Sequence, residues 1–224
     1  MKKVDLKQKV VSENESLAQA NRARFSEGRT LVLNLVSSPG SGKTSLIEET
    51  AERLRGAYGM LVLTGDLVTE NDAQRVRRHG VEAIQISTGD ACHLDARMVS
   101  DHLLVAKARH YDLVVIENVG NLVCPATFDL GEDFKVLLVS VAEGDDKPLK
   151  YPPMVRASGV LVISKTDLVP YTDSDPDRLA ENALRINPAL TVFKLSSKTK
   201  EGLDQWIGWL EARLAAKKQS RARE

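Results

Sequence analysis

Short apolar runs recur along the chain at spacings that suit the strands of a parallel sheet. The first run, 30–36, is short and rich in β-forming residues, and it follows a longer polar stretch with a loose apolar pattern. Helical patterns separate most of the later runs, and strands that alternate with helices need crossover connections. The pattern therefore predicts an α/β fold with a mainly parallel sheet of about seven strands and helices on both faces. The other predicted strands are 60–64, 83–87, 113–117, 136–141, 160–164 and 192–195, and the predicted helices are 43–55, 70–79, 94–109, 175–186 and 201–216.

Composition excludes several classes of protein. Of 224 residues, 42% are hydrophobic, which provides a core and excludes a disordered chain. Lys and Arg together number 31, as do Asp and Glu, and this balance argues against nucleic acid as a partner. The apolar runs are far shorter than the roughly 20 residues of a membrane span, and we expect no signal peptide and no membrane partner. Two cysteines are too few for a disulfide scaffold, so we expect a cytoplasmic protein.

A glycine-rich turn between the first predicted strand and helix is the strongest chemical signal. Its sequence at 37–44, Ser-Ser-Pro-Gly-Ser-Gly-Lys-Thr, matches the phosphate-loop pattern G-x-x-x-x-G-K-[ST] except at the first position. The backbone N–H groups of such a loop and the following helix N-terminus bind phosphate oxygens. An ordinary turn beside a lysine is the alternative, but the position between strand and helix favours a P-loop NTPase. The residues predicted to bind phosphates are Gly40, Ser41, Gly42, Lys43, Thr44 and Ser45.

Two acidic residues downstream complete a predicted Mg²⁺ site. Asp66 ends the second predicted strand and Glu117 ends the fourth, and strand carboxyl ends meet the ligand crevice in such sheets. We expect Thr44, Asp66 and Glu117 to bind Mg²⁺, directly or through water. The alternative is that each acid caps the next helix. The predicted catalytic residues are Lys43 at the β- and γ-phosphates, Asp66, Glu117, and Gly120 with its N–H at the γ-phosphate.

A second pair of motifs indicates a guanine base. Lys165 and Asp167 follow the sixth predicted strand, and this carboxylate can accept both the ring N–H and the amino group of guanine, a donor pair that adenine lacks. Ser164 stands where most GTPases have Asn, so we expect one weaker polar contact there. The run Ser196, Ser197 and Lys198 resembles the loop whose backbone contacts guanine O6. GTP and GDP are therefore the predicted ligands, and a turn-forming role for Asp167 is the alternative.

Both cysteines and one histidine fall in loops at strand ends. Cys92 and His93 lie between a predicted strand and helix, and Cys124 lies four residues after Gly120. Thiolate and imidazole are ligands of Ni²⁺ and Zn²⁺, and these three are one short of a closed tetrahedral site. We expect a water or a ligand from a second subunit to complete the site, and an incomplete site releases its metal readily. The alternative for each cysteine is a small buried hydrophobe.

A resemblance to a known family rests on the segments 37–44, 65–66, 92–94, 117–125 and 143–152. They are similar to those of the HypB-type GTPases, members of the SIMIBI class of P-loop GTPases that handle nickel for hydrogenase maturation. The resemblance covers residues 30–215. It implies a slow GTPase that forms a homodimer on binding nucleotide or metal. It also implies two further partners, a HypA-type nickel chaperone and the hydrogenase large subunit precursor.

Three other functions stay open. The first is a nickel GTPase for another enzyme such as urease, but that relative is expected to carry Cys-Pro-His, whereas here Cys-His and Cys-Pro are separate. The second is an ATP-dependent kinase, against which Asp167 argues. The third is a nucleotide-binding protein in which zinc only holds a dimer together.

Two further expectations depend on the resemblance. Some family members carry an N-terminal nickel store, and we expect none here because no Cys or His precedes His79. In the segment 143–152, the resemblance implies that Lys147 and Lys150 make a dimer contact that reaches the partner's nucleotide. An ordinary solvated surface loop is the alternative for this segment.

The predicted domain organisation has three parts. Residues 1–28 are expected to form a helical arm, helical over 4–27, that lies across the surface of the main body. Residues 29–216 are expected to form one GTPase domain with the metal site, since seven strands in about 170 residues leave no room for a second domain. Residues 217–224, which include several Lys and Arg residues, are expected to be a frayed, solvated tail.

Overall fold

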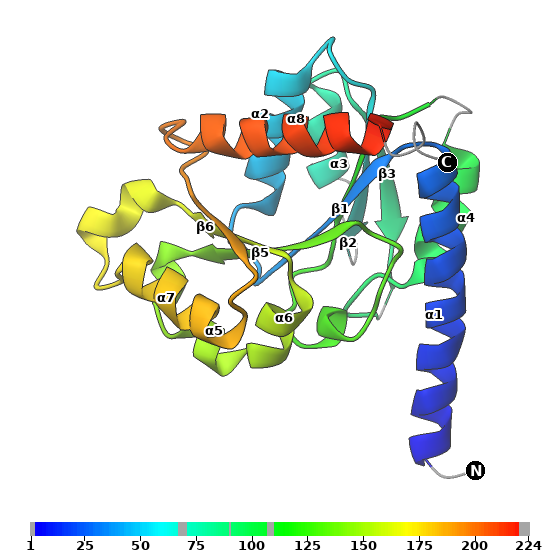
Figure 1. Cartoon of the computed structure of the whole chain (residues 1–224), viewed down its shortest axis with the longest axis horizontal. Coiled ribbons are helices and arrows are strands. Elements are labelled where there is room, and N and C mark those ends of the chain that lie inside the picture. The colour runs from blue at the N-terminus through cyan, green and yellow to red at the C-terminus, as the bar shows by residue number, and fades with distance from the viewer. Residues whose placement is uncertain (1–2, 67–70, 90, 107–109, 220–224) are drawn as a thin grey trace.

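A parallel sheet forms the centre of the molecule (Figure 1). The structure, a computed structural model, describes residues 3–66, 71–89, 91–106 and 110–219. The seven strands lie in the order β3-β2-β4-β1-β5-β6-β7, and every neighbouring pair is parallel. They are β1 (Leu31–Ser37), β2 (Met60–Asp66), β3 (Glu82–Ser87), β4 (Leu113–Glu117), β5 (Phe134–Ser140), β6 (Val160–Ser164) and β7 (Thr191–Lys194).

Helices cover both faces of this sheet. On one face lie α2, α3 and α8, and on the other lie α1, α4, α6 and α7. Within the described ranges, no helix is both long enough and apolar enough to cross a bilayer. The α-helices are α1 (Lys3–Glu27), α2 (Lys43–Leu54), α3 (Asn71–Arg77), α4 (Ala96–Val105), α5 (Lys147–Lys150), α6 (Pro152–Ala157), α7 (Pro176–Ile186) and α8 (Leu203–Gln219), and the 3₁₀ helices are η1 (Cys124–Ala126), η2 (Val141–Glu143) and η3 (Thr166–Tyr171).

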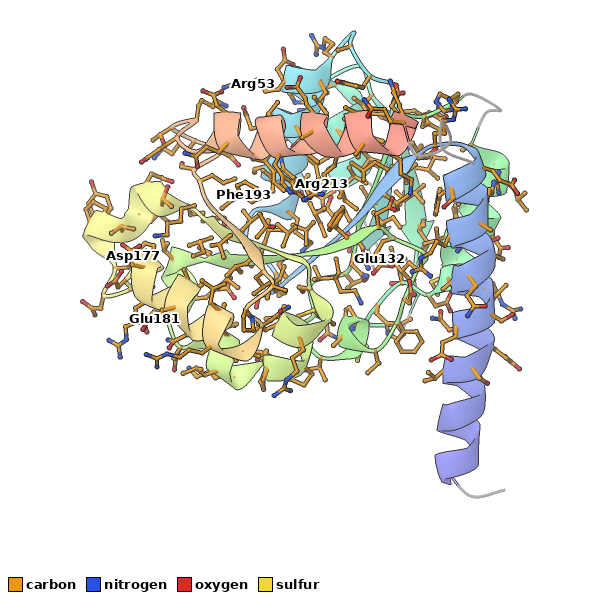
Figure 2. The ribbon with its side chains drawn as sticks, viewed as in Figure 1. Arg53, Glu132, Asp177, Glu181, Phe193 and Arg213 are labelled. Carbon is orange, nitrogen blue, oxygen red and sulfur yellow. The ribbon has the colours of Figure 1, made fainter. Side chains whose placement is uncertain are left out.

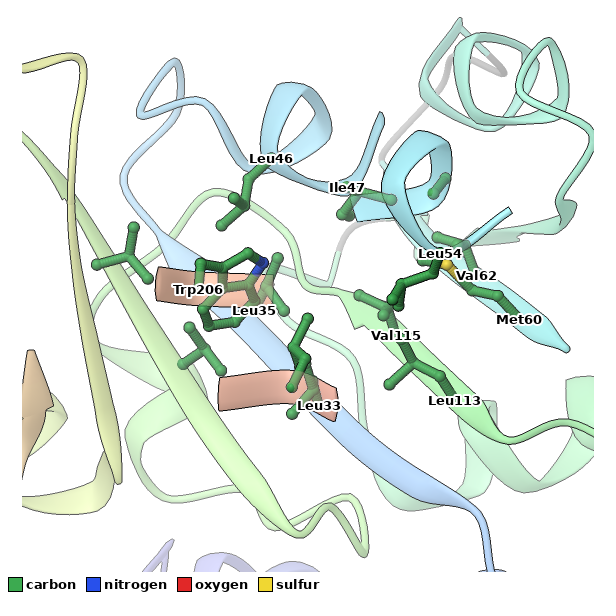
Figure 3. Close-up of a cluster of buried hydrophobic side chains, with 14 of the residues drawn as sticks. Leu33, Leu35, Leu46, Ile47, Leu54, Met60, Val62, Leu113, Val115 and Trp206 are labelled. Carbon is green, nitrogen blue, oxygen red and sulfur yellow. The ribbon is translucent and has the colours of Figure 1, made fainter. Parts of the chain in front are cut away.

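Alternate residues of the central strand face opposite cores. Leu33 and Leu35 of β1 join the cluster beneath α2 and α8, whose largest member is Trp206 (Figure 3). Val32 and Val36 belong to the two clusters on the other face. Because both faces are covered, every residue of β1, β4 and β6 is buried. This explains why these strands read as nearly continuous apolar runs in the sequence.

An aromatic group closes the core at the far edge of the sheet. Phe193 of β7 lies beneath α8 (Figure 2), and its ring centroid is 5.6 Å from that of Trp206. The Trp206 Nε1 donates to Thr50 Oγ1 of α2 at 3.0 Å, which satisfies the buried indole. This bond joins α8 to α2, the helix that follows the phosphate loop, and α8 thereby helps to hold α2 against β1.

The α/β fold with a parallel seven-stranded sheet is confirmed, and the differences lie in the helices. The helices α3 and α4 are shorter than the predicted 70–79 and 94–109, and residues 70 and 107–109 lie outside the described residues. The short helices α5 and α6 were not predicted. Each has proline in its first turn, where the missing N–H costs nothing, although proline suggests a loop when read from the sequence alone.

The C-terminal end of the chain also differs from expectation. The predicted tail is wrong at its start, because α8 continues to Gln219, and residues 220–224 lie outside the described residues. Lys217 forms an ion pair with Asp133, and Lys218 forms one with Asp112, so both lysines are anchored rather than frayed. At the other end, α1 packs along α4 while its first turns extend past the sheet (Figure 1).

Candidate functional site

A cavity of about 560 Å³ lies at the carboxyl ends of the central strands, beside the loop that joins β1 to α2. In open parallel sheets, ligands bind at the carboxyl ends of the strands, at the point where the strand order reverses. Asp72 and Arg75 of α3, which the sequence did not single out, also line the cavity. Of the residues predicted to bind the phosphates and Mg²⁺ or to take part in catalysis, all but the buried Ser41 line it: Gly40, Gly42, Lys43, Thr44, Ser45, Asp66, Glu117 and Gly120.

Lys43 is held at the bottom of this cavity. It is the first residue of α2, and its Nζ donates to Ser37 Oγ at 2.9 Å. Burial lowers the pKa of Lys43 below its usual value, although Glu117 and Asp72 oppose that shift. Ser37 is the residue that departs from the phosphate-loop pattern, and its hydroxyl takes part in holding the lysine. The serine at this position therefore helps to hold the Lys43 ammonium group beside the phosphate loop.

Glu117 is a buried carboxyl group with an unused oxygen. Its Oε1 lies 2.7 Å from Thr44 Oγ1, while its Oε2 has no hydrogen-bond partner within the described residues. Asp72 Oδ1 lies 3.0 Å from the same hydroxyl, which carries one proton and donates to one acid at a time. Burial raises the pKa of Glu117 to about 7. A cation placed between these oxygens would lower that pKa and pair the unused oxygen.

Glu117, one of the predicted Mg²⁺ ligands, does not cap a described helix. Asp66 is the last residue of β2, and α3 begins five residues later at Asn71. Glu117 ends β4, and the next helix, η1, begins only at Cys124. Both acids lie at the cavity, and their roles as ligands stay predictions.

Gly120 touches the phosphate loop. A Cβ at this position would lie 2.8 Å from Pro39 Cγ and 2.9 Å from Pro39 N, which is too close for any side chain. The segment after β4 therefore approaches the phosphate loop as closely as its backbone allows. Movement of one segment must affect the other, since there is no space between them.

The predicted base site lies beside this cavity and shares Lys165 with it. Lys165 Nζ donates to the Gly40 carbonyl at 2.7 Å, and Asp167 Oδ1 accepts from Ser196 Oγ at 2.6 Å. Ser196 Oγ also accepts from the Lys198 N–H at 3.2 Å, and Ser197 begins the turn between them. The two predicted base-binding motifs are thus brought together. None of Asp167, Ser196, Ser197 and Lys198 lines the phosphate cavity itself.

Ser164 does more than its sequence context indicates. Its Oγ donates to the Ser41 carbonyl of the phosphate loop at 2.6 Å. We expected a weaker polar contact where most GTPases have Asn, but the shorter hydroxyl reaches the loop directly and is buried there. The base motif and the phosphate loop are therefore joined by two bonds, one from Ser164 and one from Lys165.

Glu143 is a further polar residue that the sequence did not reveal. Its Oε1 accepts from Ser41 Oγ at 2.8 Å and from the Ser140 N–H at 2.9 Å, and its Oε2 lies 3.0 Å from Lys147 Nζ. Burial would raise the pKa of Glu143, but hydrogen bonding from Ser38 above all, and from the three groups just named, keeps it below its usual value. Its signal in the sequence is the capping box that Ser140 and Glu143 form at η2. That motif predicts a helix start and not a contact with the phosphate loop.

A second cluster lies on the same edge of the sheet. Cys92 Sγ is 3.0 Å from Cys124 Sγ and 3.6 Å from His93 Nδ1, and ligand atoms of all three residues lie within 4.8 Å of one another. The neighbouring Cys124 thiol raises the pKa of Cys92, and burial lowers the pKa of His93. The His93 ring packs on Phe128, with centroids 4.0 Å apart. The three residues predicted to bind Ni²⁺ or Zn²⁺ are therefore brought together, with both cysteines as free thiols.

A buried polar network joins the cysteine-bearing segments to the nucleotide side. Asn118, next to Glu117, accepts from the Leu94 N–H at 3.1 Å and donates to Asn34 Oδ1 at 3.2 Å. Asn34 in turn donates to Glu132 Oε1 at 3.1 Å. The backbone next to His93 is thus tied to the residue that follows Glu117.

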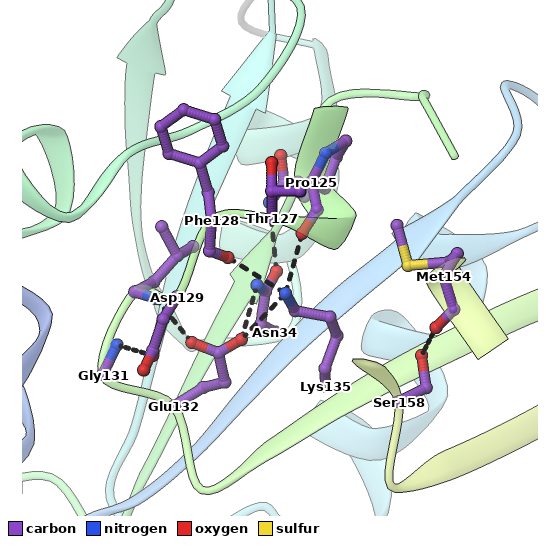
Figure 4. A network of polar contacts seen from close by, with 12 residues as sticks. Asn34, Pro125, Thr127, Phe128, Asp129, Gly131, Glu132, Lys135, Met154 and Ser158 are labelled. Carbon is purple, nitrogen blue, oxygen red and sulfur yellow. Dashed lines mark hydrogen bonds and ion pairs between the residues drawn. The ribbon is translucent and has the colours of Figure 1, made fainter. Parts of the chain in front are cut away.

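Lys135 completes this network on the other segment (Figure 4). Its Nζ donates to the Pro125 carbonyl at 2.7 Å and to the Phe128 carbonyl at 2.9 Å, and it lies 3.6 Å from Glu132 Oε1. Pro125 follows Cys124 directly. Both cysteine-bearing segments are therefore connected to β1 through buried hydrogen bonds of Asn118, Asn34 and Lys135.

Comparison with known proteins identifies the family. A family model described as CobW/HypB/UreG, nucleotide-binding domain, matches residues 31–194. Over 207 residues the chain is 48% identical to the hydrogenase maturation factor HypB of Escherichia coli K12. The aligned region covers 92% of this chain and 71% of that protein. The chain belongs to the HypB family. The resemblance drawn from its motifs is therefore confirmed.

Solved HypB structures have the same fold. The HypB of Archaeoglobus fulgidus is 41% identical, with a TM-score of 0.85 over 91% of this chain and 99% of that one. The HypB of Helicobacter pylori in complex with nickel is 38% identical, with a TM-score of 0.87 over 93% and 98%. The signal recognition particle 54 kDa protein of Aeropyrum pernix, solved with GDP, is 17% identical with a TM-score of 0.59 over 85% and 49%, so it shares the fold alone. The family model and the HypB structures place this chain among nucleotide-binding proteins with the P-loop fold.

Proposed function

We propose that this chain is a GTP-hydrolysing metallochaperone that carries nickel during the maturation of [NiFe]-hydrogenase. One observation carries the proposal: Cys124 lies four residues beyond Gly120, on the segment that touches the phosphate loop. A proposed metal ligand and a proposed phosphate contact thus lie on one connected segment, through which nucleotide can act on the metal. The names of its relatives as hydrogenase maturation factors and the solved H. pylori HypB with nickel support nickel as the cargo.

Guanine is the base that the second site fits. Asp167 is half-buried, and one of its oxygens is already bonded to Ser196. A carboxylate fixed in this way accepts the paired N–H donors of guanine, and the Lys165 stem can cover the base. GTP and GDP are therefore the proposed ligands in place of ATP.

Changing Asp167 to Asn is expected to exchange the base preference. The amide presents a donor to the 2-oxo group of xanthine and loses an acceptor for guanine, and a buried polar group left unpaired costs about 1–3 kcal/mol. GTP should bind more weakly and xanthosine triphosphate more tightly, as measured by competition against labelled GDP. Asp173→Asn, at an exposed position of the following loop, is the control. Unchanged selectivity in Asp167→Asn would place the base elsewhere.

Mg²⁺ fits the acidic side of the phosphate cavity. The donor set is one hydroxyl, Thr44, and two carboxylates, Asp66 and Glu117, and the unused Oε2 of Glu117 is buried at the cavity. When bound, the ion supplies charge neutralisation at the β- and γ-phosphates. Lys43 adds a second positive charge from the loop, and the Gly120 N–H is available to a γ-phosphate oxygen. Hydrolysis then depends on positioning and on these charges, and a slow GTPase needs no further group.

The cysteine cluster is the proposed cargo site. Cys92, His93 and Cys124 supply three soft or borderline donors, which suit Ni²⁺ and Zn²⁺. Cys92 is exposed, so a fourth ligand from water or from a second copy of the chain can reach the metal. We propose a homodimer that depends on nucleotide, metal or both. A HypA-type chaperone and the hydrogenase large subunit precursor are the proposed partners, in the cytoplasm, where thiols stay reduced.

Lys147 and Lys150 of α5 are expected to contribute to the proposed dimer. Lys150 exposes 59% of its side chain, whereas Lys147 is held by Glu143 next to the phosphate loop. Changing both to alanine should weaken dimerisation in the presence of a GTP analogue, as measured by analytical ultracentrifugation. Arg156→Ala, at an exposed position of α6, should leave dimerisation unchanged. If the variant with both lysines changed to alanine dimerises as the parent does, the segment is an ordinary surface segment with no part in the dimer.

Two measurements on the purified protein test the proposed function as a whole. Phosphate release should be slow with GTP and absent with ATP, and nickel binding should be saturable and lost in Cys92→Ala. Equal turnover of ATP would favour a kinase-like enzyme. The relative in H. pylori is named as a hydrogenase/urease maturation factor, so delivery to urease is the second candidate. Nickel transfer to the apo form of each enzyme distinguishes them.

A further inference from the structure

Two asparagines of α1 are buried although the helix lies at the surface. Asn14 and Asn21 expose only 6% and 3% of their surface, and their spacing of seven residues places them on one face of the helix. A buried amide costs free energy unless its donor and acceptor are bonded. Apolar side chains would attach the helix without that cost, so the partners of these amides matter.

Each amide bonds to two backbone segments at once. Asn14 Oδ1 accepts from the Ala96 N–H at 2.8 Å, and its Nδ2 donates to the Asp129 carbonyl at 2.8 Å. Asn21 Nδ2 donates to the Ala96 carbonyl at 2.9 Å and to the Leu130 carbonyl at 3.1 Å. Both asparagines therefore join the start of α4 to the backbone at 129–130.

These two segments continue directly from the metal-binding cluster. Ala96 follows His93 by three residues, and 129–130 follow Cys124 by five and six residues. The two segments come from different strand ends, after β3 and after β4, so the sheet alone does not fix their separation. Asn118 bonds to the first segment and Lys135 to the second, whereas α1 bonds to both.

The fit of α1 against the second segment is close. Gly131 has φ of +92°, and a Cβ there would lie 2.7 Å from the Ala18 carbonyl and 2.8 Å from Asn21 Cβ. Arg22 also donates to both oxygens of Asp129, at 2.8 and 2.7 Å. A helix that must satisfy two amides and fit against one glycine can bind in a single register. Its position therefore defines the distance between the segments that it joins.

We propose that Asn14 and Asn21 are positioning residues of the metal site, and that α1 sets the separation of Cys92 and His93 from Cys124. This inference rests on the metal-carrying function proposed above. Neither asparagine touches the metal, so each acts through the backbone that carries the ligands. Groups that orient metal ligands in this way change affinity by about 10- to 100-fold when they are removed.

Nickel titration of asparagine variants tests this role. We expect the double variant Asn14→Ala, Asn21→Ala to bind Ni²⁺ about 10- to 100-fold more weakly than the parent, and each single variant to lose less. Its Co²⁺ complex should show weaker thiolate-to-metal absorption, which reports on the two cysteines directly. GDP affinity should stay at the parent value, because no residue of α1 is among the described residues that line the phosphate cavity.

The matched control is Arg24→Ala on the same helix. Arg24 donates to the Leu103 carbonyl near the end of α4, at 3.2 Å, so its loss loosens α1 without breaking the bridge between the two segments. Its nickel affinity should equal that of the parent. If Arg24→Ala lowers nickel affinity as much as the asparagine variants do, attachment of α1 in general is responsible and the specific role is wrong.

The outcomes separate this inference from the proposed function. If the parent binds neither Ni²⁺ nor Co²⁺, the metal-carrying function is wrong and the inference falls with it. If the parent binds both ions and the asparagine variants bind them with the same affinity and the same absorption, only the inference is wrong. Should the double variant fail to fold, the two single variants decide by the same criteria.

Discussion

Lys43→Ala is expected to lower the rate of GTP hydrolysis by about 10²-fold or more. Lys43 is the charge at the bottom of the phosphate cavity, and phosphoryl transfer depends on such preorganised charges more than on bond making by the protein. Phosphate release under single-turnover conditions measures the loss. Arg53→Ala is the control, because Arg53 is a cation on the same helix that pairs with Asp204 away from the cavity.

Asp66→Ala is expected to cause a loss of similar size by a different route. Its carboxylate lines the cavity at the end of β2, where it can bind Mg²⁺ or orient the attacking water. We expect GDP to bind nearly as in the parent while turnover falls. Hydrolysis at the parent rate would show that Asp66 has no part in the reaction.

Cys124→Ala is expected to abolish any effect of nickel on nucleotide turnover. Gly120 lies against Pro39 of the phosphate loop, and Cys124 lies on the same segment four residues further on. Binding of a γ-phosphate at Gly120 would shift this segment, and hydrolysis would release it, as in other GTPase switches. The distance from Cys124 to Cys92 and His93 should then differ between the two states. Nickel should therefore change GTP affinity or turnover in the parent and have no effect in the variant.

The control for this prediction lies next to the cysteine. Val123 exposes 65% of its surface and offers no metal ligand, so Val123→Ala should keep both nickel binding and its influence on turnover. Linkage requires the influence of nickel on nucleotide to equal that of nucleotide on nickel. If Cys124→Ala binds nickel and responds to it as the parent does, the metal does not reach the phosphates through this segment.

The sheet could be predicted because its strands are buried on both faces. Residues such as Val114 and Val162 belong to continuous apolar runs, and each run ends at the edge where motif residues gather. The phosphate loop, Asp66, Glu117 and the cysteines could be found because their spacing from strand ends brings them to that edge. Each of these residues lies a short distance along the chain from the end of a strand, so local backbone geometry is enough to bring it to that edge.

Contacts between distant segments could not be predicted. Asp72 reaches Thr44 only because α3 packs beside α2, and Glu143 reaches Ser41 across 102 positions of sequence. Asn14 and Asn21 look like solvated positions of a loosely patterned helix, although both are buried against backbone groups. A polar residue carries no mark in the sequence that separates a surface position from one paired with a distant carbonyl.

Nickel affinity measured with GDP and with a non-hydrolysable GTP analogue tests the central claim most directly, because it asks whether the two sites communicate. Isothermal titration on the same preparation, with the oligomeric state followed in parallel, gives both values. We expect the affinities to differ by about 5- to 150-fold, the range of a coupling free energy of about 1–3 kcal/mol. Identical nickel affinities in the two nucleotide states would contradict the account.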